Sequence, residues 1–172
     1  IAPTLTVVKD VVNDNGDDAT VNDFNIQMDD ESLVFDSGTT NTDTKTTTYT
    51  STPSVIANKT YSLSEDPLDG YVNGIWTCVD NDTHEIVSED ESISLGEGQN
   101  VTCTITNDDV APKLTLIKEF EEGYEGTTLP DDFNLTVGGN TVLSGEENEY
   151  DANTEYVIDE TQLDGFVFYS IT

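Results

Sequence analysis

Apolar and polar residues alternate with a period of two in several short segments of the chain. In residues 4–9, Leu5, Val7 and Lys9 fall on one face and the residues between them fall on the other. Residues 101–107 alternate in the same way, with threonine at every second position. Such alternation predicts β-strands with one buried and one exposed face, and no window shows the sustained 3.6-residue period of a helix.

Turn-forming residues separate these segments. Clusters of Asn, Asp and Gly occupy residues 13–16, 68–70, 73–74 and 138–139, and these residue types favour tight turns. Short strands joined by regular turns predict an all-β fold. We therefore expect immunoglobulin-like, antiparallel β-sandwich modules of about 110 residues each.

The chain contains an internal repeat. Residues 2–9 recur at 111–118, an offset of 109, and residues 61–65 recur at 156–160, an offset of 95. The second copy is therefore 14 residues shorter (109 − 95) between these blocks, opposite the threonine-rich stretch 39–52. Repetition at this length indicates two tandem domains, with the threonine-rich stretch as an insertion peculiar to the first.

The repeat places the domain boundary near residue 110. Residues 1–109 form a complete module, whereas residues 110–172 have no counterpart of residues 78–109, which include the closing strand. A sandwich without that strand has unpaired backbone groups and an uncovered core. We expect the edge to be filled by a continuation of the chain or by a strand from a neighbouring subunit. We favour the second alternative, which would couple folding to growth of a filament.

The charge of the chain excludes several classes of function. Thirty-six acidic residues outnumber five lysines, and the net charge is −31. Such a surface excludes nucleic-acid binding and argues against docking on anionic membranes. No apolar run approaches the ~18 residues of a membrane span, and no signal peptide is found. We therefore expect no membrane insertion and interpret the chain as a mature or excised segment.

Residues that carry catalysis are nearly absent. The single histidine, His84, lies in a polar stretch, where an exposed turn or strand position is the simplest interpretation. The chain has no Gly-rich phosphate loop, His–Glu metal motif or nucleophile elbow. We therefore expect no enzyme that acts on an external substrate.

Four motifs follow one another in a characteristic order. They are Leu-Thr-Val-Val-Lys-Asp-Val-Val-Asn-Asp-Asn-Gly at 5–16, Tyr-Ser-Leu-Ser-Glu with Leu-Asp-Gly-Tyr at 61–71, Trp-Thr-Cys at 76–78, and Val-Thr-Cys-Thr-Ile-Thr-Asn-Asp-Asp at 101–109. Together they resemble bacterial surface repeats of the SpaA-like, prealbumin-like fold, which are close to the collagen-adhesin B-type (Cna B) modules. The resemblance covers nearly all of residues 1–109 and the first two-thirds of a module in 110–172. It implies tandem β-sandwich spacers of adhesins, pili and surface fibres, at the cell surface or outside the cell.

The resemblance also implies a covalent bond. In Cna B-like modules, a lysine on the first strand can condense with Asn or Asp on the last strand while a glutamate shuttles the proton. Lys9, Glu65 and Asn107 fill these positions in order, and the alternation points Lys9 and Asn107 inward. Burial lowers the pKa of a lysine until its neutral amine can attack an amide. The alternative is an ordinary Lys9–Glu65 ion pair. In the second copy Lys118 and Glu160 match, but the chain contains no acceptor for them.

The two cysteines lie on predicted strands. In an extracellular β domain, Cys78 and Cys103 are interpreted as one disulfide. It would close a loop of 25 residues and contribute about 3 kcal/mol in the chain-entropy model. The alternative is two buried free thiols, and a metal site is not expected because no histidine lies nearby.

Four Asn-X-Thr sequons begin at Asn58, Asn81, Asn100 and Asn134. Chance gives about this number in a chain so rich in Asn, Ser and Thr, so they are candidates for N-linked glycans on residue type alone. Asn100 and Asn134 lie on or beside strands with threonine-rich outer faces, which suits exposed glycans. The stretch 39–52 could carry O-linked sugar, although an exposed β-hairpin is the simpler interpretation.

Residues 13–18 resemble a calcium loop in composition. Asp14, Asp17 and Asp18 are weak ligand candidates, although the EF-hand template would need aspartate where Val11 stands. A turn is the simpler interpretation. Calcium remains the one cofactor candidate because the acidic charge is otherwise uncompensated. Adaptation to a saline habitat is the alternative explanation of that charge.

These observations favour a structural protein: tandem β-sandwich modules of an extracellular fibre, pilus or adhesin stalk, with copies of itself as partners. The alternative is a ligand- or carbohydrate-binding adhesin module, which predicts a concave aromatic cluster. Its candidate residues are Tyr71, Trp76, Phe166, Phe168 and Tyr169, which fit core strands at least as well.

Overall fold

The structure is a computed structural model that describes residues 1–121 and 123–171. It is all-β apart from two short 3-10 helices. The chain divides into two compact units, unit 1 (Ile1–Val110) and unit 2 (Ala111–Thr172). Each unit has its own hydrophobic core.

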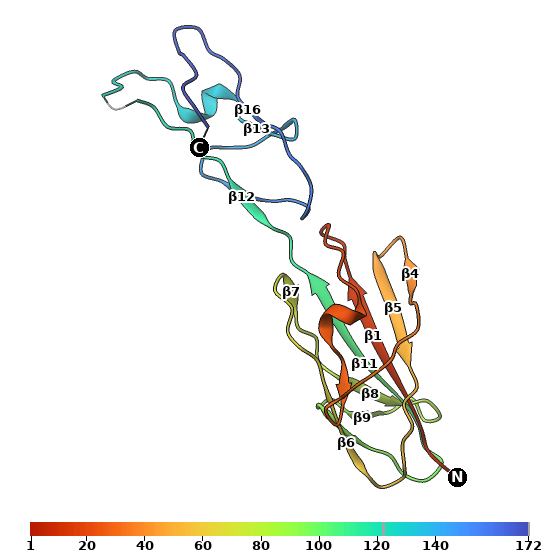
Figure 1. Ribbon diagram of the computed structural model, residues 1–172. Helices are drawn as coiled ribbons and strands as arrows, with labels where there is room; N and C mark the ends of the chain where they lie inside the picture. Colours follow the sequence, from red (N-terminus) through yellow and green to blue (C-terminus); the bar gives the residue numbers. More distant parts are fainter. Residues whose placement is uncertain (122, 172) are drawn as a thin grey trace. The chain divides into compact units, whose positions relative to one another are not determined.

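Unit 1 is built from two β-sheets (Figure 1). Its elements are β1 (Thr4–Val12), η1 (Val21–Phe24), β2 (Gln27–Met28), β3 (Glu31–Ser32), β4 (Thr39–Asn41), β5 (Thr46–Ser51), β6 (Thr60–Ser64), β7 (Tyr71–Val72), β8 (Thr77–Asp80), β9 (Ile86–Ser88), β10 (Ser92–Ser94) and β11 (Asn100–Asp109). The larger sheet has the order β4-β5-β1-β11-β8-β9, with β7 also paired to β11, and the smaller sheet has the order β10-β6-β2-β3.

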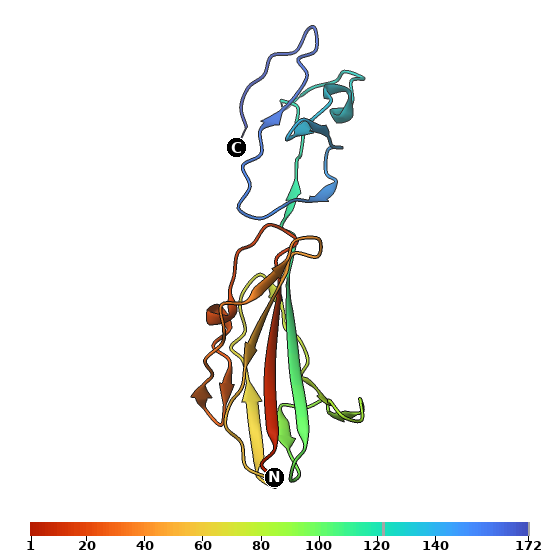
Figure 2. The ribbon, with the colours of Figure 1, turned by 90° about the vertical axis from the view of Figure 1, so that its right-hand side faces the viewer.

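The first and last strands of unit 1 lie side by side at the centre of the larger sheet (Figures 1 and 2). β1 pairs with β11 in parallel, with Lys9 opposite Ile105 and Val11 opposite Asn107. Every other strand pair in the described residues is antiparallel, as the turn pattern predicts. The parallel pair brings residues from the two ends of unit 1 into contact.

The threonine-rich stretch 39–52 forms the hairpin of β4 and β5, and β5 also pairs with β1. The glycine before this hairpin, Gly38, has φ +74°, and a Cβ there would lie 2.6 Å from the ring of Tyr49. A glycine is needed at this position because a side chain would be strained and would overlap that ring.

The alternation seen in the sequence fills the space between the two sheets. Leu5 and Val7 from β1 and Ile105 from β11 are buried, and Leu63 from β6 in the smaller sheet packs into the same cluster. The threonines between them lie on the outer face, so each strand has one buried face and one face toward solvent. Unit 1 is therefore a β-sandwich with one core.

Unit 2 contains smaller sheets. Its elements are β12 (Lys113–Thr115), η2 (Pro130–Phe133), β13 (Thr136–Val137), β14 (Asn140–Thr141), β15 (Glu147–Glu149) and β16 (Ile158–Asp159). β12 pairs with β15, and β13 lies between β14 and β16. The core of the unit consists of Phe133, Leu135, Val137 and Val142.

The first strand of unit 2 is shorter than the repeat predicts. β1 has nine residues and includes Lys9, whereas β12 ends at Thr115, three residues before Lys118. The physical reason is the number of neighbours. β1 is hydrogen-bonded on both edges, whereas β12 is paired on one edge only in the described residues.

Candidate functional site

A lysine is completely buried in the core of unit 1. The side chain of Lys9 has 0% exposure and that of Glu65 has 9%. Asn107, on the neighbouring strand β11, is also 0% exposed. An unpaired charge in such a place would cost several kcal/mol, so the partners of this lysine decide what the site is.

The three side chains form a closed hydrogen-bonded ring. Lys9 Nζ donates to Glu65 Oε2 at 2.7 Å and also donates to Asn107 Oδ1. Asn107 Nδ2 donates to Glu65 Oε1 at 2.9 Å. One carboxylate therefore contacts both the amine and the amide nitrogen through its two different oxygens.

Burial is the main electrostatic influence on the lysine. It lowers the pKa of Lys9, while the hydrogen bond to Glu65 and the charges of Glu65 and Asp10 oppose the shift. The ammonium also lies 3.9 Å from the ring centroid of Phe24, a cation–π contact that covers the remaining face of the charge.

Local structure holds the glutamate in place. Glu65 directly follows β6, and the next residue, Asp66, donates its backbone N–H to the carbonyl of Phe24 at 2.8 Å. Phe24 is the last residue of η1, so this contact ties the loop carrying the glutamate to the ring beneath the lysine.

Gly74 lies against β11, where a Cβ would come within 2.1 Å of the carbonyl oxygen of Thr106.

A surface cleft of about 730 Å³ reaches this site. Glu65 is part of its lining, together with Gly74, Trp76 and Ile105. The carboxylate is thus the member of the ring that lies nearest to solvent, while the lysine and the asparagine are closed off.

The arrangement can form an amide bond between side chains. The lysine nitrogen touches the carboxamide oxygen, and the carboxylate is placed to accept a proton from the amine at Oε2 and to give one to the amide nitrogen at Oε1. A neutral amine is a nucleophile, and the lowered pKa of Lys9 makes that form more accessible. In the alternative of an ordinary Lys9–Glu65 ion pair, Asn107 is a hydrogen-bond partner of both charged groups.

Unit 2 repeats two of the three members. Lys118 Nζ donates to Glu160 Oε2 at 2.7 Å and lies 4.3 Å from the ring centroid of Phe133. The backbone N–H of Thr161 donates to the carbonyl of Phe133 at 2.7 Å, as Asp66 does to Phe24 in unit 1. No amide side chain contacts this lysine in the described residues.

The two cysteines form a disulfide on facing strands. Cys78 of β8 is directly opposite Cys103 of β11, and their Cα atoms are 3.9 Å apart. Both are fully buried. The bond confirms the predicted pairing and ties β11 to β8, while the lysine site lies between β11 and β1.

The family described as a prealbumin-like fold domain, of the SpaA type, matches residues 2–105 and 109–167 of the chain. The chain belongs to this family. Each unit is covered by a matched segment, in agreement with the tandem arrangement of the sequence. Comparisons with curated proteins and with solved structures found no match. Membership of the SpaA-like family indicates a structural repeat module of a surface protein. In the described residues, no helix is long and apolar enough to cross a membrane.

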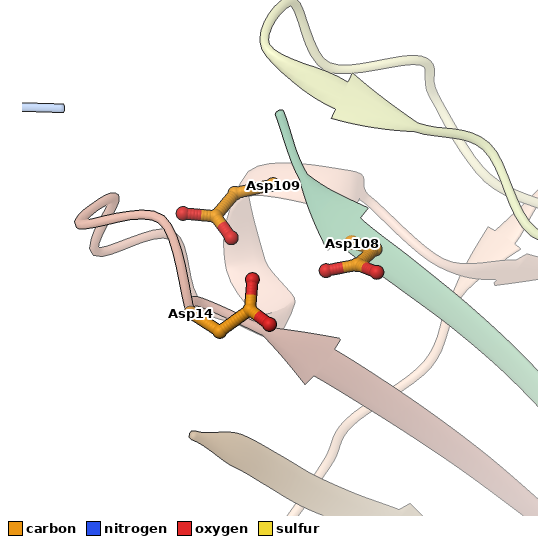
Figure 3. Close-up of side chains that lie close together, drawn as sticks. All are labelled: Asp14, Asp108 and Asp109. Atoms are coloured by element: carbon orange, nitrogen blue, oxygen red, sulfur yellow. The ribbon is translucent and has the colours of Figure 1, made fainter. Parts of the chain in front are cut away.

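Acidic side chains gather where the parallel strands of this SpaA-like unit end (Figure 3). Carboxylate oxygens of Asp14, Asp108 and Asp109 lie within 4.8 Å of one another. Asp17 and Asp18, the other two calcium candidates, are not part of this group. Asp108 and Asp109 could not be found from the sequence pattern, because only the parallel β1–β11 pairing brings the end of β11 next to the turn that follows β1.

The contacts of two members of this group are explained by the protein itself, through backbone hydrogen bonds to Asp109 and charge repulsion on Asp108. The carboxylate of Asp109 accepts the backbone N–H groups of Asn15 and Asp17, each at 3.0 Å. Burial, together with the charges of Asp14 and Asp109, raises the pKa of Asp108. The turn interpretation of residues 13–18 is therefore enough to explain these contacts.

The four sequons differ in how their amides are used. Asn58 is exposed in a turn before β6. Asn81 Nδ2 donates to Asn100 Oδ1 at 3.0 Å, and Asn100 is partly buried. Asn134 is exposed and ends η2, where its oxygen accepts a bond from Thr141. Asn58 therefore has the least engaged side chain of the four.

The aromatic candidates do not form a concave cluster within either unit. Tyr71 and Trp76 are buried in the core of unit 1, and Phe166 packs against Phe133 of unit 2. Phe168 and Tyr169 are 47% and 97% exposed. Of the first three, Tyr71 lies on a core strand, β7, whereas Trp76 is buried just before β8 and Phe166 is half-buried outside any strand. His84 is exposed in a turn, as its polar surroundings predict.

Proposed function

We propose that this protein is a structural subunit of an extracellular fibre, pilus or adhesin stalk, and that its first unit is locked by an isopeptide bond between Lys9 and Asn107. The observation that carries the proposal is the buried ring of Lys9, Glu65 and Asn107. Membership of the SpaA-like family supports it. The same family membership supports a location at the cell surface and a role without catalysis on external substrates.

The bond forms by exchange of one amide for another. The Lys9 ammonium gives a proton to Glu65, and the neutral Nζ attacks Cγ of Asn107. Glu65 returns this proton to Nδ2 and takes the second proton from Nζ; the Cγ–Nδ2 bond then breaks, and Glu65 is left protonated. The products are a secondary amide between the two side chains and one molecule of ammonia, which the cleft beside Glu65 lets out. No oxidant or cofactor takes part.

Such a bond suits a module that carries tension. Lys9 and Asn107 are 98 residues apart in sequence but lie on adjacent strands at the centre of the larger sheet. A pulling force would therefore pass from β1 to β11 through the new amide and would bypass the rest of the unit. The disulfide between β8 and β11 adds a second covalent tie on the other side of β11.

Single-molecule stretching of the full chain tests this function. Without the bond, the segment between Lys9 and Asn107 extends when the chain is pulled. Its 98 residues less the 25 that the disulfide holds leave 73 residues, or about 250 Å of extended chain. The Asn107→Ala variant should show this step, and the native chain should not. The same step in both would contradict the proposal.

Assembly is tested separately. Regular filaments in electron micrographs of the native material would support a fibre built from copies of this chain. Dispersed monomers or a cell-attached receptor would favour the alternative of a ligand-binding adhesin module.

N-linked glycans, if the chain carries them, are expected first at Asn58, whose side chain is exposed and makes no hydrogen bond in the described residues.

A further inference from the structure

Two Asn-Gly dipeptides of unit 1 have no part in the lysine site. Asn15-Gly16 lies in the turn after β1, and Asn73-Gly74 begins the link from β7 to β8. This dipeptide is chemically labile, because glycine has no side chain to keep its backbone nitrogen away from the side-chain carbonyl carbon of the asparagine before it. Since the two dipeptides are identical, their surroundings decide which of them reacts.

The fold requires a glycine at position 74. β7 and β8 both pair with β11, at residues 108–109 and 101–104, and the link between them passes residues 105–106 of the same strand. A Cβ on residue 74 would lie 2.1 Å from the carbonyl oxygen of Thr106 and 2.9 Å from Cγ1 of Ile105. A side chain at this position is therefore excluded, and the backbone nitrogen of Gly74 stays unshielded.

The side chain of Asn73 is free to turn. Asn73 is exposed and is part of the lining of the cleft of about 730 Å³, where water reaches it. Neither its carboxamide nor the backbone N–H of Gly74 makes a hydrogen bond in the described residues. Ring closure onto the Gly74 nitrogen therefore needs only rotation about bonds of Asn73 itself.

Asn15 has the opposite surroundings. Its Nδ2 donates to Asp14 Oδ1 at 2.7 Å and to the backbone carbonyl of Asp109 at 2.8 Å. Its backbone N–H donates to the carboxylate of Asp109 at 3.0 Å, and the residue is partly buried. Because these bonds hold both the side chain and the backbone, they must open before the carboxamide can reach the nitrogen of Gly16.

We propose that Asn73 is a site of spontaneous deamidation, with water as the only reagent, and that the fold protects Asn15 from the same reaction. The inference rests on the surroundings of the two dipeptides and does not depend on the lock between Lys9 and Asn107. Because ammonia leaves and is not returned, the change accumulates with the age of the chain.

The reaction proceeds in two balanced steps. The Gly74 nitrogen attacks Cγ of Asn73, its proton passes through water to Nδ2, and the Cγ–Nδ2 bond breaks to release one ammonia. The cyclic succinimide that remains then adds one water at either of its two carbonyls. Opening at one carbonyl gives aspartate, and opening at the other gives isoaspartate, whose backbone is longer by one carbon.

Both products disturb unit 1. The lining of the cleft has no basic residue among the described residues and contains the carboxylates of Glu65, Glu89, Asp90 and Glu91. Each product adds a further negative charge beside them, and isoaspartate also lengthens a link that has no spare room against β11. Ageing should therefore lower the guanidinium midpoint of unit 1, which the fluorescence of Trp76 in the same link reports.

Ageing the full native chain in a mildly alkaline buffer tests the inference. Fragment spectra of the reduced chain, taken at intervals, measure the gain of about 1 Da that deamidation leaves at an asparagine. Asn73 should gain this mass through an intermediate that is lighter by about 17 Da, the mass of ammonia. Asn15 should react at least about tenfold more slowly, because a single net hydrogen bond that must open is worth that factor.

Two matched samples separate the effect of the fold from that of the sequence. In guanidinium, where the protecting bonds are lost, Asn15 and Asn73 should react at similar rates. The Asn73→Gln variant should neither gain mass at residue 73 nor lose stability on ageing, because glutamine must close a larger ring and reacts far more slowly.

Three results would overturn the inference. They are an Asn73 that gains no mass, a reaction at Asn15 in the native chain that is as fast as at Asn73, and a difference between the two sites that persists in guanidinium. The lock of unit 1 is measured independently, because its deficit of about 17 Da lies between Lys9 and Asn107 and leaves residues 73–74 unmodified.

Discussion

The strength of the Lys9–Asn107 link can be measured by a double-mutant cycle. Asn107→Ala removes the acceptor and keeps the Lys9–Glu65 pair, and Lys9→Met removes the nucleophile and keeps an unbranched side chain of similar length. Each single change also disturbs packing, and the cycle cancels these disturbances to leave the coupling energy between the two residues.

The structure sets the expected magnitude. A covalent link between residues 98 positions apart lowers the entropy of the unfolded chain by an amount worth about 4–5 kcal/mol. The disulfide shortens this loop by 25 residues, which changes the value by only a few tenths of a kcal/mol because the dependence is logarithmic. A charge-assisted hydrogen bond alone would give about 1.5–3 kcal/mol.

Fluorescence of Trp76 provides the assay. Trp76 is the single tryptophan of the chain and is 3% exposed in the core of unit 1, so its signal follows unfolding of that unit alone. Guanidinium titrations of the native chain, both single variants and the double variant give the four free energies of unfolding. A coupling of 4 kcal/mol or more is expected. A value of 3 kcal/mol or less would refute the covalent link.

Three further predictions concern unit 1. Because burial and two neighbouring carboxylates raise the pKa of Asp108, its ionised form destabilises the fold. Asp108→Asn should therefore raise the guanidinium midpoint at pH 7, and the gain should vanish as the pH falls through that raised pKa toward 4; an equal gain at both pH values would contradict this. Burial, assisted by nearby aspartates, raises the pKa of Tyr71 to about 12, and its hydroxyl donates to Asn13 Oδ1 at 2.5 Å. Tyr71→Phe should cost about 1–3 kcal/mol of unfolding free energy, and no loss would show that the bond is not needed. Replacing Cys78 and Cys103 together by Ala should cost about 3 kcal/mol, and an unchanged midpoint would argue against the disulfide's role.

Much of the site could be predicted from alternation and order. Lys9 and Asn107 both fall on the apolar face of their segments, so their burial follows from the period of two. Glu65 ends a segment, residues 61–65, that recurs at 156–160 with Glu160 in the same place, so the repeat indicates its position. Phe24 could not be placed under the lysine in this way, because η1 is too short to leave a periodic signal.

The pairing of distant segments is what the sequence could not supply. Alternation shows which face of a strand is buried but does not show its neighbour. Contact between the first and last strands was implied only by the family resemblance, through the Lys9–Asn107 bond, and the meeting of Asp14 with Asp108 was not predicted. The length of β12 depends on the same information. Its sequence matches β1 closely, yet it ends three residues before Lys118, because a strand extends only where a neighbour pairs with it.

The mass of the intact chain tests the isopeptide lock most directly. Under non-reducing conditions the native chain should weigh about 19 Da less than its sequence, about 2 Da from the disulfide and about 17 Da from lost ammonia. After reduction the deficit of about 17 Da should remain. Fragment spectra should place it between Lys9 and Asn107, and Glu65→Gln should restore the full mass. A reduced native chain with the mass of its unmodified sequence would contradict the account.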